Sequence, residues 1–181
     1  MATTLLTMMH IFAPEILGGL TNYLIGVICL AVLPVLAYPI QPIIPGFRGK
    51  GRDGQRMLAI IMSVLGYVIS VALAFILNMP DGAKALFLTY LFSGTLIFVF
   101  SKLIKVKASG HTCGVAGPVA VSTFAFGTSA YIPALGFGIP LLALVFAASL
   151  GMKRHKWSEL ILGSIIPVVS MLLSMLIVGL I

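Results

Sequence analysis

The chain has 181 residues, of which 60% are hydrophobic and only 8% are charged. Soluble globular domains carry about 25% charged residues, so this composition excludes an ordinary soluble protein and indicates a protein of the lipid bilayer. Eleven Lys and Arg residues against four Asp and Glu give a formal net charge of +7. Because charge is scarce, its location along the chain carries most of the functional information.

The apolar stretches predict an all-α protein, a polytopic transmembrane helical bundle that forms one domain over residues 1–181. A spanning helix needs about 20 mostly apolar residues, since each adds about 1.5 Å and the hydrocarbon core is about 30 Å thick. The first dozen residues, MATTLLTMMHIF, lack the basic start and cleavage site of a signal peptide and fit an interfacial helix. About six spans are then expected in chain order, near residues 17–39, 57–78, 85–104, 113–131, 133–151 and 159–181.

The fourth of these stretches, CGVAGPVAVSTFAFGTSAY, differs from the others because it is rich in Gly, Ser and Thr. Small residues let neighbouring helices approach closely, and hydroxyl groups can bond across them. We therefore expect this span to be a central helix surrounded by protein. The alternative is a weakly hydrophobic helix at the surface of the bundle.

Basic residues are concentrated in three of the expected loops. Six spans place both termini on one side of the membrane, and alternate loops then share a side. Ten of the eleven Lys and Arg residues fall in loops of one side. The positive-inside rule makes this side cytoplasmic, unless the cations are there to bind an anionic substrate. We expect an integral membrane protein of a bacterial or archaeal cell membrane. The ten residues are Arg48, Lys50, Arg52, Arg56, Lys102, Lys105, Lys107, Lys153, Arg154 and Lys156.

Two of these basic loops also carry a histidine, in KVKASGH (105–111) and KRHKWSE (153–159). His155 and Glu159 are four residues apart, so on a helix the carboxylate can accept a hydrogen bond from the imidazole and fix its tautomer. A histidine held in this way can attack phosphorus, a second histidine can protonate the leaving oxygen, and Lys or Arg can hold the phosphoryl oxygens. The pattern predicts a phosphoryl-transfer site. The alternative is that both loops only contact lipid headgroups.

At these residues the sequence resembles a known family. ASGH (108–111) is similar to the Pro-Ser-Gly-His motif of the type 2 phosphatidic acid phosphatase family, integral-membrane lipid phosphatases with a six-helix core. ASLGMKRHKWSELILGS (148–164) is similar to the family's third motif, Ser-Arg-x5-His-x3-Asp. The resemblance implies metal-independent dephosphorylation through a phosphohistidine intermediate. It implies His155 as the nucleophile, Glu159 as its orienting acid, His111 as the general acid, and Ser109 with Gly110 as phosphate-binding residues.

The sequence also departs from the family pattern. The first motif, Lys-x6-Arg-Pro, is absent, and Ala148 and Ser149 stand where the third motif has Ser and Arg. The missing cations are expected from other positions. The candidates for binding the substrate phosphate are Lys105, Lys107, Arg154 and Arg56.

The expected substrate is a lipid phosphate, either a polyprenyl phosphate or diphosphate or a glycerolipid phosphate, and the other expected partners are membrane lipids. We expect no nucleic-acid partner, no cofactor and no metal, and a monomer or a homodimer. Cys29 and Cys113 have no ligand-type spacing and are expected to be small core residues. Two alternatives remain open: a catalytically inactive relative that binds or transports lipid, and a small transporter, which would usually carry a charge within a span.

Overall fold

The computed structural model describes residues 2–125, 127–153 and 155–181, with the side chains of Lys102 and of residues 123–134 left undescribed. Every regular element in this part of the chain is a helix. In chain order the elements are α1 (Ala2–Phe12), α2 (Pro14–Leu17), α3 (Leu20–Val27), a π-helical segment (Ile28–Val32), α4 (Leu33–Ile40), α5 (Gly51–Ile76), α6 (Asp81–Phe98), a second π-helical segment (Val99–Leu103), α7 (Gly110–Ala125), α8 (Gly127–Gly151) and α9 (Trp157–Ile177).

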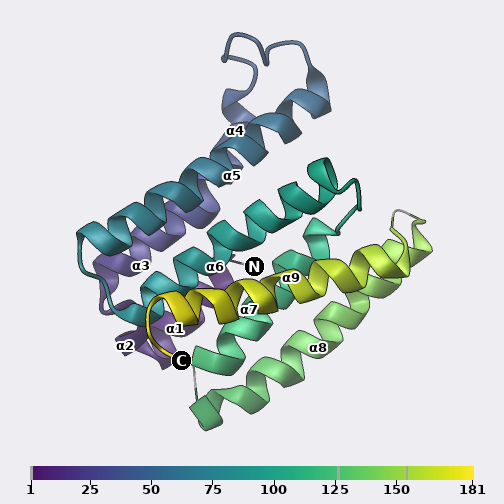
Figure 1. The fold of residues 1–181 in the computed structure, drawn as a ribbon. Helices are drawn as coiled ribbons and strands as arrows, with labels where there is room; N and C mark the ends of the chain where they lie inside the picture. Colours follow the sequence, from purple (N-terminus) through teal and green to yellow (C-terminus); the bar gives the residue numbers. More distant parts are fainter. Residues whose placement is uncertain (1, 126, 154) are drawn as a thin grey trace.

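Helices overlap all six expected spans, and α3, the first π-helical segment and α4 together form the first of them as one continuous helix (Figure 1). The expected break between the fourth and fifth spans, at residue 132, lies inside α8, because α7 ends at Ala125 and α8 begins at Gly127. Four helices in the described part of the chain are long and apolar enough to cross a membrane: Leu20–Ile40, Gly51–Ile76, Asp81–Ser101 and Trp157–Ile177. Helix α7 has 16 residues, about 24 Å at 1.5 Å per residue, which is short for a span. Helix α8 has 25 residues, Gly127–Gly151, and its described side chains form an apolar helix from Leu135 to Gly151. The all-helical membrane architecture is confirmed, whereas the number of six spans is not.

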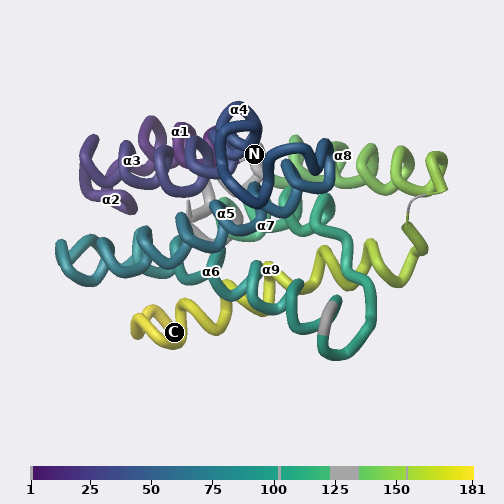
Figure 2. Tube along the Cα trace, turned by 90° about the horizontal axis from the view of Figure 1, so that it is seen from above, coloured from purple at the N-terminus to yellow at the C-terminus, as the bar shows by residue number. Residues whose placement is uncertain are grey.

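Helix α7 lies inside the bundle, as its composition predicted. It packs against α6, α8, α9 and α1, and Figure 2 shows α1, α3 and α8 on one side of the bundle and α9 on the opposite side. Among its described side chains, the buried ones are Thr112, Cys113, Val115, Ala116, Pro118, Ala120, Val121 and Ser122. A helix enclosed in this way meets little lipid, so it needs neither the length nor the hydrophobicity of an outer span.

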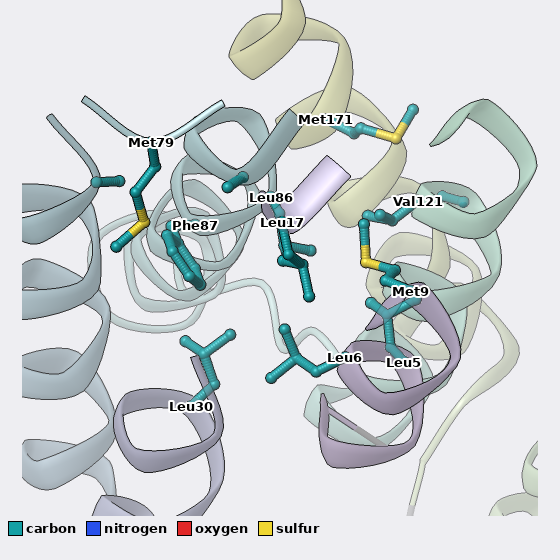
Figure 3. Close-up of a cluster of buried hydrophobic side chains, with 13 residues drawn as sticks. Leu5, Leu6, Met9, Leu17, Leu30, Met79, Leu86, Phe87, Val121 and Met171 are labelled. Atoms are coloured by element: carbon teal, nitrogen blue, oxygen red, sulfur yellow. The ribbon is translucent and has the colours of Figure 1, made fainter. Parts of the chain in front are cut away.

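The hydrophobic core contains the N-terminal helix, which the sequence had suggested would be interfacial. Leu5, Leu6 and Met9 of α1 are at most 2% exposed and pack with Phe87 of α6 and Val121 of α7 (Figure 3). Large apolar side chains elsewhere face outward, for example along α5, where a bilayer would cover them. Helix α1 is therefore part of the bundle.

One close approach of backbones shapes the first half of the bundle. A Cβ atom added at Gly66 of α5 would lie only 2.0 Å from the carbonyl oxygen of Cys29. Cys29 belongs to the π-helical segment Ile28–Val32, where the backbone hydrogen bonds span five residues instead of four and the helix is locally wider. Only glycine allows α5 to pass this close to the segment.

The three basic loops lie at one end of the bundle. Figure 1 shows the connections α4–α5, α6–α7 and α8–α9 at the same end, with the C-terminus at the other end. The grouping of the cations that the loop alternation predicted is therefore present. Helix α5 starts at Gly51, well before the expected position 57, so part of the glycine-rich basic stretch is helical.

Candidate functional site

His155 and Glu159 form the predicted pair at the start of α9. The Nδ1 atom of His155 lies 2.7 Å from Oε2 of Glu159. Glu159 is in the first turn of α9, where the helix dipole favours a negative charge, and His155 lies just before the helix. The two side chains are 14% and 16% exposed. The pair is thus largely shielded, and Nδ1 donates to the carboxylate, which leaves Nε2 free to act as a base or nucleophile.

Ser109 caps helix α7. Its hydroxyl oxygen accepts a long hydrogen bond of 3.4 Å from the backbone N–H of Thr112, the arrangement typical of a serine before the first helical turn. The Ser109 residue is fully buried, whereas Gly110 and His111 are exposed. Contacts from this turn to a ligand would therefore come from the backbone of Gly110 and from His111, while the Ser109 hydroxyl serves the cap.

The starts of α7 and α9 are joined directly. The backbone N–H of Ser109 donates a 2.9 Å hydrogen bond to the carbonyl oxygen of Glu159. The hydroxyl of Thr112 shares its hydrogen between two carbonyl oxygens, that of Ser109 at 3.0 Å and that of Leu160 at 3.1 Å. These bonds hold the Ser-Gly-His turn beside the residue that positions His155. The two histidine loops that the sequence placed on one side therefore meet.

Gly163 makes this junction possible. A Cβ atom at Gly163 would lie 2.3 Å from both the Ser109 carbonyl oxygen and the Thr112 hydroxyl oxygen. Thr112 and Gly163 were not expected to be site residues. In the sequence, Gly163 was marked only by its position one turn after Glu159. Thr112 was marked only by its position directly after the Ser-Gly-His motif.

The predicted cations differ in how close they come to this junction. The ammonium group of Lys107 interacts electrostatically with the Glu159 carboxylate. Lys105 is exposed in the same loop and has a left-handed backbone, with φ of 59°. Arg56 is exposed on α5 and, among the described side chains, has no hydrogen bond or ion pair that ties it to α7 or α9. Arg154 lies outside the described residues.

The electrostatic character of the junction is positive. Two helix N-termini meet there, and each presents unpaired N–H groups and the positive end of a helix dipole. Lys105 and Lys107 add two cations, and His111 stands exposed on the first turn of α7. The site suits an oxyanion such as a phosphate group. Among the described residues, no group of three His, Cys, Asp or Glu side chains is placed to hold a metal ion.

The departures from the family pattern have structural counterparts. Ser149, at the arginine position of the third motif, is buried in α8, and Ala148 is exposed on the same helix. Neither side chain can supply a positive charge. Among the described side chains, the cations at this junction, Lys105 and Lys107, lie in the loop that precedes α7.

No protein-family model, curated protein or solved structure matches this chain. The similarity to the lipid phosphatases therefore rests on the two short motifs. Of the residues of these motifs, Ser109, His155 and Glu159 lie together at the junction of α7 and α9.

Proposed function

We propose that the chain is an integral-membrane lipid phosphatase. It hydrolyses a phosphate or pyrophosphate monoester of a polyprenyl or glycerolipid substrate through a phosphohistidine intermediate. The observation that carries the proposal is the hydrogen-bonded His155–Glu159 pair, held against the Ser-Gly-His turn by the bond from the Ser109 N–H to the Glu159 carbonyl oxygen. Phosphoryl transfer is favoured over simple contact with lipid headgroups by three features: the oriented imidazole, the second histidine, and the two helix N-termini that can bind an anion.

In the first step, Nε2 of His155 attacks the phosphorus atom. A P–N bond forms and the P–O bond to the lipid breaks, while His111 gives its proton to the departing lipid oxygen. Glu159 accepts the hydrogen bond from Nδ1, which keeps the reactive tautomer and stabilises the positive charge that develops on the ring.

In the second step, water attacks the phosphohistidine. His111, now neutral, takes a proton from the water, the P–N bond breaks, and inorganic phosphate leaves with Nε2 of His155 free again. The phosphoryl oxygens are held by Lys105 and Lys107 and by the backbone N–H groups of Gly110 and His111. Arg154, next to the nucleophile in the chain, and Arg56 are further proposed contacts. The reaction needs no metal because the histidine supplies the nucleophile and the cations neutralise the phosphate.

One observation favours a second candidate function, a catalytically inactive relative that binds or transports lipid. The position of the motif arginine is occupied by the buried Ser149, so a phosphate-clamping side chain of the family pattern is missing. Such a protein would still bind a lipid phosphate at the positive junction.

Phosphate release by the purified protein in detergent separates the two functions. We expect release that persists in EDTA from at least one substrate among phosphatidic acid, phosphatidylglycerol phosphate, and polyprenyl phosphates and diphosphates. The ranking of rates identifies the lipid class. Absence of release from every lipid by folded protein, with saturable lipid binding retained, would favour the inactive relative instead.

We also propose six membrane spans, with the basic end of the bundle in the cytoplasm. The clustering of the basic loops at one end supports this orientation (Figure 1). Single cysteines in place of Lys50 and Asn78, in a protein with Cys29 and Cys113 replaced by Ala, provide the test. A membrane-impermeant maleimide should label the Asn78 position in intact cells and the Lys50 position only after lysis. The reverse pattern would place the basic end outside.

A further inference from the structure

A cavity inside the bundle begins at Gly110, beside the junction of α7 and α9. The cavity, of about 120 Å³, runs between α6 and α7, with Pro167 of α9 and Tyr67 of α5 also in its wall. On α7 it follows one helical face, from Gly110 to Val121. The eleven steps of 1.5 Å from Gly110 to Val121 correspond to about 16.5 Å of depth, roughly half the thickness of a hydrocarbon core.

The walls of this cavity carry hydroxyl groups without hydrogen-bond partners. Among the described residues, the hydroxyl oxygens of Tyr90 and Ser93 are buried and have no partner. Ser93 is 8% exposed. The Cys113 thiol interacts with the Ser93 hydroxyl, although the contact falls short of a hydrogen bond of normal geometry.

Two other buried hydroxyl groups, one on α6 and one on α9, are satisfied by their own helices. Thr89 donates to the carbonyl oxygen of Ala85 at 2.7 Å, and Ser170 donates to that of Ile166 at 2.8 Å. This bond one turn back is the usual solution for a hydroxyl group in an apolar environment. Tyr90 and Ser93 depart from it where they face the cavity, and a buried hydroxyl group without a partner lowers the stability of the folded state.

We propose that this cavity is a hydrated chamber, which takes water from the basic end at Gly110 and holds it against Tyr90 and Ser93. Its volume admits several water molecules, since one needs about 10–15 Å³ of such space. The wall residues carry no formal charge, so the chamber suits a neutral ligand that both donates and accepts hydrogen bonds. Gly114 keeps it open: a Cβ atom there would meet no atom within 4 Å.

The reactivity of the Cys113 thiol can be used to detect water in this chamber. Alkylthiosulfonates react with the thiolate, which forms only where water solvates it. The other cysteine, Cys29, is equally buried, at 4% against 7% exposure, but lies outside the walls of the chamber. Two single-cysteine proteins, Cys29→Ala and Cys113→Ala, therefore form a matched pair.

The experiment measures the rate at which 2-aminoethyl methanethiosulfonate modifies each protein, by intact mass. We expect Cys113 to react at least about tenfold faster than Cys29, because only Cys113 meets water. Replacing Gly114 by Leu in the Cys29→Ala protein fills the chamber and should slow the reaction about tenfold. Gly136→Leu on α8, where a Cβ atom also meets no atom within 4 Å, should leave the rate unchanged.

Equal rates for the two cysteines, or a rate that Gly114→Leu leaves unchanged, would overturn the proposal. A second measurement needs neither reagent nor cysteine variants. If the cavity is dry, Tyr90→Phe and Ser93→Ala remove unpaired polar groups and should raise the melting temperature. If it is hydrated, these substitutions should not raise the melting temperature. Neither readout uses phosphatase activity, so the chamber and the proposed function can fail independently.

Discussion

Replacing His155 by Ala should lower EDTA-resistant phosphate release by at least about 10³-fold, because it removes the group that forms the covalent intermediate. His111→Ala should cost about 10²- to 10⁴-fold, the usual contribution of a general acid. The measurement is the rate of inorganic phosphate release at saturating substrate. Each variant must have the same elution volume and melting temperature as the parent protein.

The third histidine of the chain supplies the matched control. His10 lies in α1 with its ring stacked on Tyr23, at a centroid distance of 4.8 Å, and has no role in the proposed reaction. His10→Gln should keep the parental rate if it folds. Retention of activity in folded His155→Ala would show that another group is the nucleophile and would reject the phosphohistidine mechanism.

The role of Glu159 can be separated from that of the nucleophile. Glu159→Gln keeps a side chain of the same size but loses the negative charge that stabilises the imidazolium. Because an amide nitrogen beside Nδ1 also favours the wrong tautomer, we expect a fall in kcat with little change in KM. A positioning residue of this kind shifts the acid side of the pH–rate profile, which a purely structural residue would not do.

Much of this architecture follows from short-range patterns. The helical segments come from the length of the apolar runs, and the grouping of the cations from the alternation of loops. The spacing of four residues predicts a hydrogen bond between His155 and Glu159 on one helical face. The bond is present at 2.7 Å, but His155 reaches Glu159 from just before α9, which begins at Trp157. Each of these features is set by residues close together in the chain.

The features that the sequence did not predict depend on contacts between distant segments. The apolar pattern of α1 is the same for an interfacial helix and for a core helix, and only the partners of Leu6 and Met9 distinguish them. The bond between Ser109 and Glu159 uses backbone atoms, which carry no residue-specific signal. The hydroxyl groups of Tyr90 and Ser93 also gave no signal, because their lack of partners depends on how α6 faces α7.

A substitution at the junction of α7 and α9 is expected to have a large effect on stability. Gly163→Ala should lower the apparent melting temperature in detergent, because its Cβ atom would lie 2.3 Å from the Ser109 carbonyl oxygen and the Thr112 hydroxyl oxygen. Backbone cannot yield as a flexible side chain can, so α7 must move away from α9. Overpacking of this kind costs about 1–3 kcal/mol, with a further loss if the hydrogen bond from Thr112 to Leu160 breaks.

Gly136→Ala on α8 is the matched control, since a Cβ atom there meets no atom within 4 Å and alanine is the better helix former. It should leave the melting temperature unchanged or slightly raised. Because the same contact holds the Ser-Gly-His turn beside His155, Gly163→Ala should also lower kcat, even at temperatures where the variant is fully folded. An unchanged melting temperature together with parental kcat would mean that α7 and α9 are not packed this closely. The proposed site, which depends on the same contact, would then lose its geometric basis.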